Sequence, residues 1–148
     1  MAKSAAAEQP NILILMTDQQ RYDSLGCYGA DWVKTPNLDR LASQGVVFDN
    51  YYTTNPVCTP SRASLFTGKQ LPGHGVYKLH DILPEEEICF TRRLQQRGYH
   101  TALFGKMHVS GRIFEESRRH PNDGFDVYEW CMEAMLAMDS PLNSYAPW

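Results

Sequence analysis

A cysteine, a proline and an arginine lie close together in VCTPSRASLFTG, residues 57–68, where a helix is predicted to start near Ser61 or Arg62. The free backbone N–H groups and the dipole of such a helix would favour an anion next to Cys58. Arg62 adds a permanent cation whose planar fork matches tetrahedral oxyanions. Cys58 is therefore open to four interpretations: a thiol nucleophile, a metal ligand, a packed core cysteine or the precursor of another chemical group.

Cysteine phosphatases also place a cysteine and an arginine around an anion. They separate the two residues by a longer loop, whereas here only Thr59, Pro60 and Ser61 lie between Cys58 and Arg62. The spacing weakens a phosphatase interpretation. Taken alone, a single cysteine before a proline is more often a buried structural residue.

Further polar residues follow predicted strands. Apolar, β-prone runs at 12–16, 46–53 and 99–105 predict three strands, the first of them buried on both faces of a parallel sheet. The residues that follow these strands are Asp18, Cys58, Lys106 and His108. Ligands of open α/β sheets gather beyond the carboxyl ends of the strands. We therefore expect three loops to converge on one site.

Two further helices are predicted between the strands, besides the one that starts near Ser61. Thr35 can cap the first helix, Pro36 suits its first position and Gly45 would supply a left-handed stop. The second helix would start at Pro84, with three glutamates in its first turn, and end at Gly98 after several arginines. These charges oppose the helix dipole, as expected for a stable helix.

The order of strands and helices predicts an α/β fold, with a mostly parallel sheet flanked by helices. Residues 1–10 have the composition of a flexible tail, and a short helix is predicted over 132–138. The sequence ends without a recognisable last strand, so we expect the sheet to be incomplete in this chain.

Composition excludes several classes of protein. The chain has 148 residues, of which 43% are hydrophobic and 21% charged, which is typical of a globular domain. Its formal net charge of -3 gives no reason to expect nucleic acid or an anionic membrane as a partner. The four cysteines form no C-x-x-C pair, so a zinc knuckle is not expected. No signal peptide is recognisable, which makes a cytoplasmic location the default expectation.

The segment PVCTPSRASLFTG, residues 56–68, resembles the signature of the type I, formylglycine-dependent sulfatases of the alkaline-phosphatase-like superfamily. GYHTALFGKMH, residues 98–108, is similar to the second signature of that family, with Phe104 in place of a smaller residue. NILILMTDQQ resembles the family's first strand and metal-binding aspartate, and TPNLDRLASQGVVFDNYYT the helix and strand that follow. The likeness covers residues 11–126 and implies an alkaline-phosphatase-like fold, with 11–148 as the N-terminal portion of the catalytic domain.

By this resemblance, Cys58 would be oxidised after translation to formylglycine, an aldehyde. A formylglycine-generating enzyme or an anaerobic sulfatase-maturating enzyme would read Pro60 and Arg62 in doing so. One hydroxyl of the hydrated aldehyde would attack the sulfur of a sulfate ester, and the other would let the carbon return to the aldehyde and expel sulfate. The implied substrate is a small-molecule or carbohydrate sulfate ester.

The resemblance also implies roles for the other candidate residues. Asp18 would bind Ca²⁺ together with an oxygen of modified Cys58, because hard cations prefer oxygen ligands. Arg62 would hold the hydrated aldehyde, Lys106 would neutralise the sulfate, and His108 would assist deprotonation of the second hydroxyl. Gln19 stands where many sulfatases have a second aspartate, and its carbonyl oxygen is a further candidate ligand.

Two departures from the family pattern leave alternatives open. Gln19 after Asp18 also occurs in phosphonate monoester hydrolases of the superfamily, so a phosphonate or phosphate ester is the alternative substrate. The later aspartate that completes the family's metal site has no counterpart before Trp148. We therefore expect this truncated chain to be inactive by itself, and a non-catalytic sulfatase fragment is the third interpretation.

Overall fold

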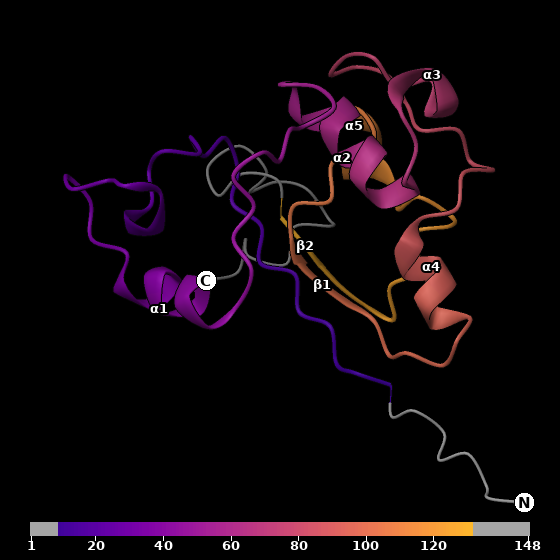
Figure 1. Ribbon diagram of the computed structural model, residues 1–148. Helices are drawn as coiled ribbons and strands as arrows, with labels where there is room; N and C mark the ends of the chain where they lie inside the picture. Colours follow the sequence, from indigo (N-terminus) through magenta and orange to yellow (C-terminus); the bar gives the residue numbers. More distant parts are fainter. Residues whose placement is uncertain (1–8, 132–148) are drawn as a thin grey trace, which may run out of the picture. The chain divides into compact units, whose positions relative to one another are not determined.

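A computed structural model describes residues 9–131 of the chain. The chain divides into two compact units, Met1–Val47 and Phe48–Trp148, and each is described by itself (Figure 1). The helix predicted over 132–138 lies outside the described residues. No helix in the described part is both long and apolar enough to cross a membrane.

The first unit contains a short 3-10 helix, η1 (Gly26–Tyr28), and a regular helix, α1 (Pro36–Gln44). The helix predicted after Thr35 is confirmed, with Pro36 at its start. The Thr35 hydroxyl does not cap α1; it accepts a 2.8 Å hydrogen bond from the Gly26 N–H. The predicted left-handed stop is wrong, because Gly45 has a φ of -124° and ends the helix in extended backbone.

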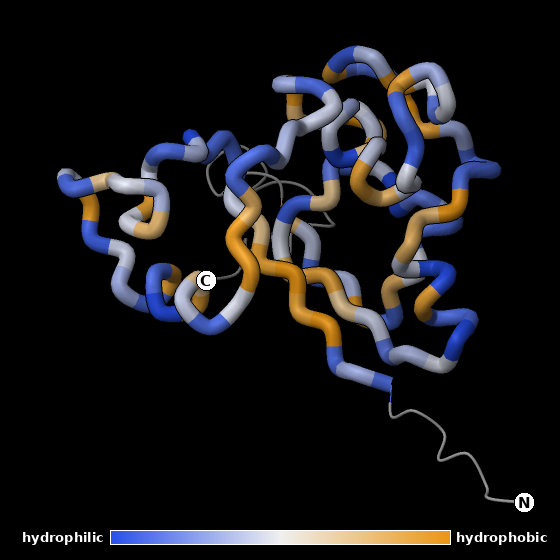
Figure 2. The backbone as a smooth tube through the Cα atoms, in the orientation of Figure 1, coloured by the Kyte–Doolittle hydropathy of each residue, from blue (hydrophilic) through white to orange (hydrophobic). Residues whose placement is uncertain are grey.

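The prediction of a strand at 12–16 is wrong. This run contains no strand, and its five side chains are 45% to 82% exposed. Figure 2 colours the run as hydrophobic. A strand needs a hydrogen-bonded neighbour, and within residues 9–131 the only strand pairing lies elsewhere. The segment 46–53, also predicted as a strand, is likewise irregular, with Tyr51 and Tyr52 exposed.

The second unit contains four helices and two strands in its described part. In chain order these are α2 (Cys58–Thr67), α3 (Leu71–His74), α4 (Phe90–Gln95), β1 (Ala102–Gly105), α5 (Arg112–Ser117) and β2 (Val127–Trp130). The strands β1 and β2 are parallel, with Ala102 opposite Val127, and Figure 1 shows them side by side. The predicted α/β class with parallel pairing is therefore confirmed, although neither β2 nor α5 was predicted from the sequence.

The helix predicted from Pro84 begins later than expected. Residues 84–87 form a turn, closed by a bond from the Glu87 N–H to the Pro84 carbonyl, and α4 starts only at Phe90. Gly98 has a φ of +87°, which agrees with the predicted stop. The glutamates therefore lie before the helix and cannot act on its first turn as predicted.

The core of the second unit joins α2, α4 and β2. The Phe66 ring of α2 stacks on the Phe90 ring of α4 with centroids 5.5 Å apart, and Trp130 of β2 is fully buried. The chain reaches β2 through Gly124, where a Cβ atom would lie 2.1 Å from the Arg92 Cα of α4. Burial of aromatic rings accounts for much of the stability of such a core. This core supports the N-terminus of α2 and the exit of β1.

Candidate active site

The helix α2 begins at Cys58 itself, three residues before the predicted start. Val57 is in extended conformation, with φ -90° and ψ 136°, and its N–H donates to the Asn55 side chain at 2.7 Å. Pro60 lies in the first turn, where backbone N–H groups have no partner inside the helix and the missing N–H of proline costs nothing. Cys58, half-buried and free, therefore lies at the positive end of the α2 dipole.

Two hydrogen bonds join the start of α2 to the residues after β1. Arg62 Nη1 donates to the Lys106 carbonyl oxygen at 2.6 Å. Thr59 Oγ1 and His108 Nε2 lie 3.0 Å apart, and both side chains are buried. Arg62 is only 8% exposed, so its guanidinium is held at a fixed position. The structure thus brings Arg62, Lys106 and His108 together around the helix that begins at Cys58.

The loop after β1 is also bound by Glu115 of α5. The two oxygens of this carboxylate accept hydrogen bonds from the backbone N–H groups of His108, at 2.9 Å, and Ser110, at 3.0 Å. The Trp130 indole N–H lies 3.3 Å from the same carboxylate, which is 4% exposed. Burial raises the pKa of Glu115, and these donors oppose that effect because they favour the charged form.

Asp18 and Gln19 belong to the first unit and are exposed. Their side chains offer carboxylate and amide oxygens, the donor types that Ca²⁺ prefers. They fit such a cation in kind, but two side chains supply only part of the ~6–8 oxygens it takes. Across residues 9–131, no group of three or more His, Cys, Asp and Glu side chains could hold a metal ion.

Backbone strain coincides with two of the predicted site residues. In the described part of the chain, Gln19 and His108 are the non-glycine residues with positive φ, at 48° and 53°. Such conformations cost energy for residues with a Cβ atom and occur often at functional sites. Both residues were selected from the sequence on other grounds, so the strain is an independent reason to regard them as functional.

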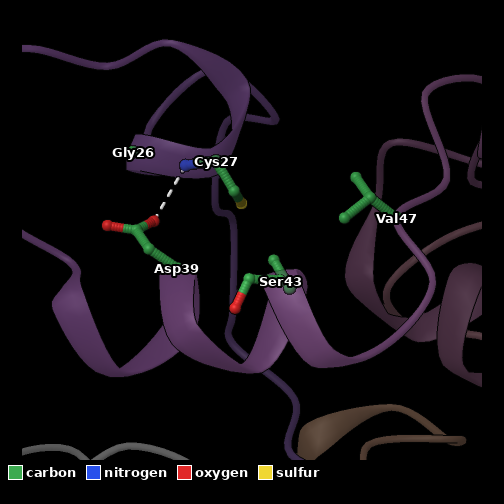
Figure 3. Close-up of a pocket in the computed structure, with 6 residues that line it drawn as sticks. Gly26, Cys27, Asp39, Ser43 and Val47 are labelled. Carbon is green, nitrogen blue, oxygen red and sulfur yellow. Dashed lines mark hydrogen bonds between the residues drawn. The ribbon is translucent and has the colours of Figure 1, made fainter.

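A separate pocket lies in the first unit and contains none of the predicted site residues. Its volume is about 460 Å³, and it is lined by Gly26, Cys27, Asp39, Ala42, Ser43 and Val47. Figure 3 labels these residues except Ala42. The Asp39 carboxylate accepts a 2.8 Å bond from the Cys27 N–H, drawn in Figure 3, and a 3.0 Å bond from the Thr35 hydroxyl. Asp39 thus connects η1 to α1, and we assign it a structural role.

Sequence reasoning missed two residues of the arrangement, Thr59 and Glu115. Thr59 occupies the position between Cys58 and Pro60, and its hydroxyl gives no signal of a partner 49 positions away. Glu115 stands in RIFEES, where a glutamate ordinarily belongs to a solvated helix face. Ile113 of the same helix is 81% exposed, so the apolar residues of α5 give no indication that Glu115 is buried.

Comparison with known proteins places these residues in context. A family model described as "Sulfatase" matches residues 10–145. An ulvan-active sulfatase of Formosa agariphila is 43% identical over 123 residues, which are 82% of this chain and 24% of that protein. The chain thus spans about a quarter of the length of this curated relative.

Two solved structures are similar along most of the chain. One, described as a complex with its substrate D-glucosamine-2-N,6-O-disulfate, has a TM-score of 0.73 at 35% identity and covers 88% of this chain and 24% of that one. The other, a phosphonate monoester hydrolase of Agrobacterium radiobacter, has a TM-score of 0.73 at 28% identity and covers 88% of this chain and 27% of that one. The two neighbours share the alkaline-phosphatase-like fold predicted from the sequence.

Proposed function

Because the chain belongs to the sulfatase family, we propose that its full-length protein hydrolyses a sulfate monoester through a formylglycine formed from Cys58. The observation that carries this proposal is the pair of hydrogen bonds from Arg62 to the Lys106 carbonyl and between Thr59 and His108. They connect the two segments, 56–68 and 98–108, that resemble the family signatures. These contacts support a shared role for Arg62, Lys106 and His108.

Each residue has a role that its position supports. The N-terminus of α2 favours negative charge beside residue 58, because backbone N–H groups and the helix dipole point there. Arg62, hydrogen-bonded to the Lys106 carbonyl, keeps a buried cation in the second turn of that helix. Lys106 would neutralise the sulfate group of the ester. His108, whose Nε2 contacts Thr59, would take up and return a proton at residue 58.

The modified residue would supply the nucleophile. As a hydrated aldehyde it carries two hydroxyls on one carbon, so that one can accept the sulfuryl group while the other drives its release. A serine at this position has one hydroxyl and could not release sulfate in that way. Maturation of Cys58 by a formylglycine-generating or anaerobic sulfatase-maturating enzyme is therefore part of the proposal.

We further propose that Asp18 and Gln19 would hold a Ca²⁺ ion through their side-chain oxygens, together with an oxygen of modified residue 58. Bound there, the ion would supply Lewis-acid stabilisation of negative charge on oxygen. Binding needs an ionised carboxylate, whereas an asparagine offers only a neutral oxygen. Asp18→Asn in the full-length protein should weaken Ca²⁺ binding, measured by isothermal titration calorimetry.

Sulfated carbohydrate is the substrate class we favour. The relative from Formosa agariphila is named for activity on ulvan, and one neighbour is described in complex with a disulfated glucosamine. Both are similar to this chain along more than four fifths of its length. Other small-molecule sulfate esters, such as aryl or choline sulfate, are the comparison substrates in a test.

A phosphonate or phosphate ester is the second candidate substrate. The similarity to the phosphonate monoester hydrolase and the presence of Gln19 directly after Asp18 favour it. Lys106 and His108 instead favour sulfate, because the second signature that contains them belongs to the sulfatase pattern. Both reactions would use the same modified residue, so only substrate comparison separates them.

The test is expression of the full-length protein with and without a formylglycine-generating enzyme. Peptide mass spectrometry should find formylglycine at residue 58 only with that enzyme present, and turnover of 4-nitrophenyl sulfate should exceed turnover of a phenylphosphonate ester. Cys58→Ala should abolish turnover, whereas Cys27→Ala should leave it unchanged as a matched thiol control. Turnover that persists with an unmodified thiol at residue 58 would refute the proposal.

A further inference from the structure

Glu115 is a buried acidic side chain that the proposed reaction does not use. It lies on α5, is 4% exposed, and directs both oxygens at the loop after β1. A buried carboxylate is costly unless hydrogen bonds satisfy it. Here two backbone N–H groups and the Trp130 indole N–H do so. The neighbouring Glu116 instead forms a half-exposed ion pair with Arg112, which is the ordinary use of a helix glutamate.

The Glu115 carboxylate binds a segment that contains a residue with strained backbone, His108. His108 has a φ of 53°, and its N–H is one of the two that the carboxylate accepts, at 2.9 Å. The Ser110 N–H, bound at 3.0 Å, fixes the loop two residues later. A left-handed backbone persists at a residue with a Cβ atom only where the surroundings enforce it. The Glu115 carboxylate is therefore in the position needed to enforce this conformation.

Two residues of α2 also contact the loop after β1. Arg62 binds the Lys106 carbonyl, and Thr59 contacts the His108 ring at Nε2. The residue with the positive φ is thus also the residue whose ring contacts α2. The loop is thus bound by the Arg62 guanidinium at Lys106 and by the Glu115 carboxylate at His108 and Ser110.

We propose that Glu115 is a positioning residue for the reaction: its carboxylate holds the backbone of the loop after β1 so that His108 is presented to the N-terminus of α2. The inference rests on the proposed function, because it assigns Glu115 an effect on proton transfer by His108. Glu115 itself contacts neither substrate nor residue 58 in this scheme. Its contribution is geometric, and misplacement of a reacting group by about 1 Å can cost about 10²-fold in rate.

The experiment uses the full-length, formylglycine-containing protein and the variant Glu115→Gln. An amide places a donor where one of the two backbone N–H groups needs an acceptor, so the loop should lose its geometry. We expect kcat for 4-nitrophenyl sulfate to fall about 10²-fold and the pH profile of kcat to be displaced, with residue 58 modified to the same extent. The control Glu116→Gln removes the same charge from the same helix and should change neither.

A second measurement is independent of turnover. Amide hydrogen exchange at His108 and Ser110 should be slow in the wild-type protein and faster in Glu115→Gln, with no change in Glu116→Gln. Unchanged exchange in Glu115→Gln would overturn the inference, as would an unchanged kcat with an unchanged pH profile. A wild-type protein that carries formylglycine but hydrolyses no sulfate ester would refute the proposed function, while exchange would still decide whether Glu115 holds the loop.

A conservative variant covers the case in which Glu115→Gln does not fold. Glu115→Asp keeps the charge but withdraws it by one methylene, so it should retain a cooperative melt and lose about tenfold in kcat. Its exchange at His108 and Ser110 should lie between those of the wild type and the glutamine variant. Wild-type kcat and exchange in a folded Glu115→Asp would count against the inference.

Discussion

Arg62 Nη1 and the carbonyl oxygen of Lys106 lie 2.6 Å apart and are separated by 44 positions in the chain. Arg62 is 8% exposed, so the bond is shielded from water. It connects α2 to the residues that follow β1. Hydrogen bonds from charged donors are stronger than neutral ones. The side chain that the family pattern assigns to chemistry therefore also has a structural contact.

This dual role predicts that Arg62→Lys is not a conservative change. A lysine ammonium lacks the planar fork of arginine. It cannot donate hydrogen bonds both to the Lys106 carbonyl and to a group near residue 58. We expect a loss of about 1–3 kcal/mol in the free energy of unfolding, from chemical denaturation, together with a large loss of turnover. Arg21→Lys is the control, because its partner Asp23 forms an exposed pair. Equal stability of the two variants would contradict a structural role for Arg62.

The thiols should differ in reactivity in protein made without the maturing enzyme. Burial raises the pKa of Cys89 to about 12, whereas Cys58 is half-buried at a helix N-terminus. At pH 8 only about 10⁻⁴ of Cys89 would be thiolate, the reactive form. Iodoacetamide should therefore label Cys58 and spare Cys89 in the native protein, and label both in urea. Peptide mass spectrometry measures this, and rapid native labelling of Cys89 would show that its environment is open.

His74 should make stability depend on pH. Its Nδ1 accepts the Val76 N–H at 3.1 Å, so Nε2 carries the proton and donates to Ser64 Oγ at 2.8 Å. Burial lowers the pKa of His74 below the usual 6.5, an effect that Lys69 adds to and Glu87 opposes. The unfolded chain then binds the proton more tightly than the folded one. Stability is complete above about pH 6.5 and falls as the pH drops from there toward the lower, folded-state pKa.

Urea unfolding at pH 7.5 and pH 5.5 tests this expectation. The contribution of His74 cannot exceed about 1.4 kcal/mol per pH unit. His74→Gln should be less stable at pH 7.5 and show a smaller loss on acidification than the wild type. His80→Gln removes an exposed imidazole and should keep the wild-type pH dependence. If both variants kept that dependence, another group would be responsible for it.

Gly124 should tolerate no side chain. Its φ is +73°, and a Cβ atom there would lie 2.1 Å from the Arg92 Cα, a clash with backbone that a rotamer change cannot relieve. Gly124→Ala should therefore abolish the cooperative melt. Gly98→Ala is the matched control, since its φ of +87° is also left-handed but no atom lies within 4 Å of the added Cβ. That variant should lose only about 1–2 kcal/mol, and a folded Gly124→Ala of similar stability would refute the clash.

Features with a local cause were predicted well from the sequence. Pro36 marks the start of α1 because its fixed φ suits a first helical position, and the strand β1 was recognised from the β-prone run that ends at Gly105. The placement of Lys106 and His108 directly after β1 follows from that strand. Cys58 was expected near the start of a helix, and the error of three residues falls at a helix boundary, the part of an element that a sequence predicts least reliably.

Features that depend on distant partners were not predicted. The strand β2 and the helix α5 have four and six residues, too few to show a clear hydrophobic period. The run 12–16 was predicted as a buried strand because it is apolar, but an apolar run does not indicate which neighbour will cover it. The glutamates after Pro84 indicated a helix start, yet the turn they form ends before α4 begins.

The burial of residues at the start of α2 has a consequence for the timing of the proposed maturation. Pro60 and Thr59 are fully buried there and Arg62 nearly so, which leaves none of them accessible to another protein's binding groove. A modifying enzyme that recognises Pro60 and Arg62 must therefore meet them before α2 has packed. Chemical conversion of residue 58 would have to occur on the nascent, unfolded polypeptide, and a molecule that folds first would be locked in its thiol form.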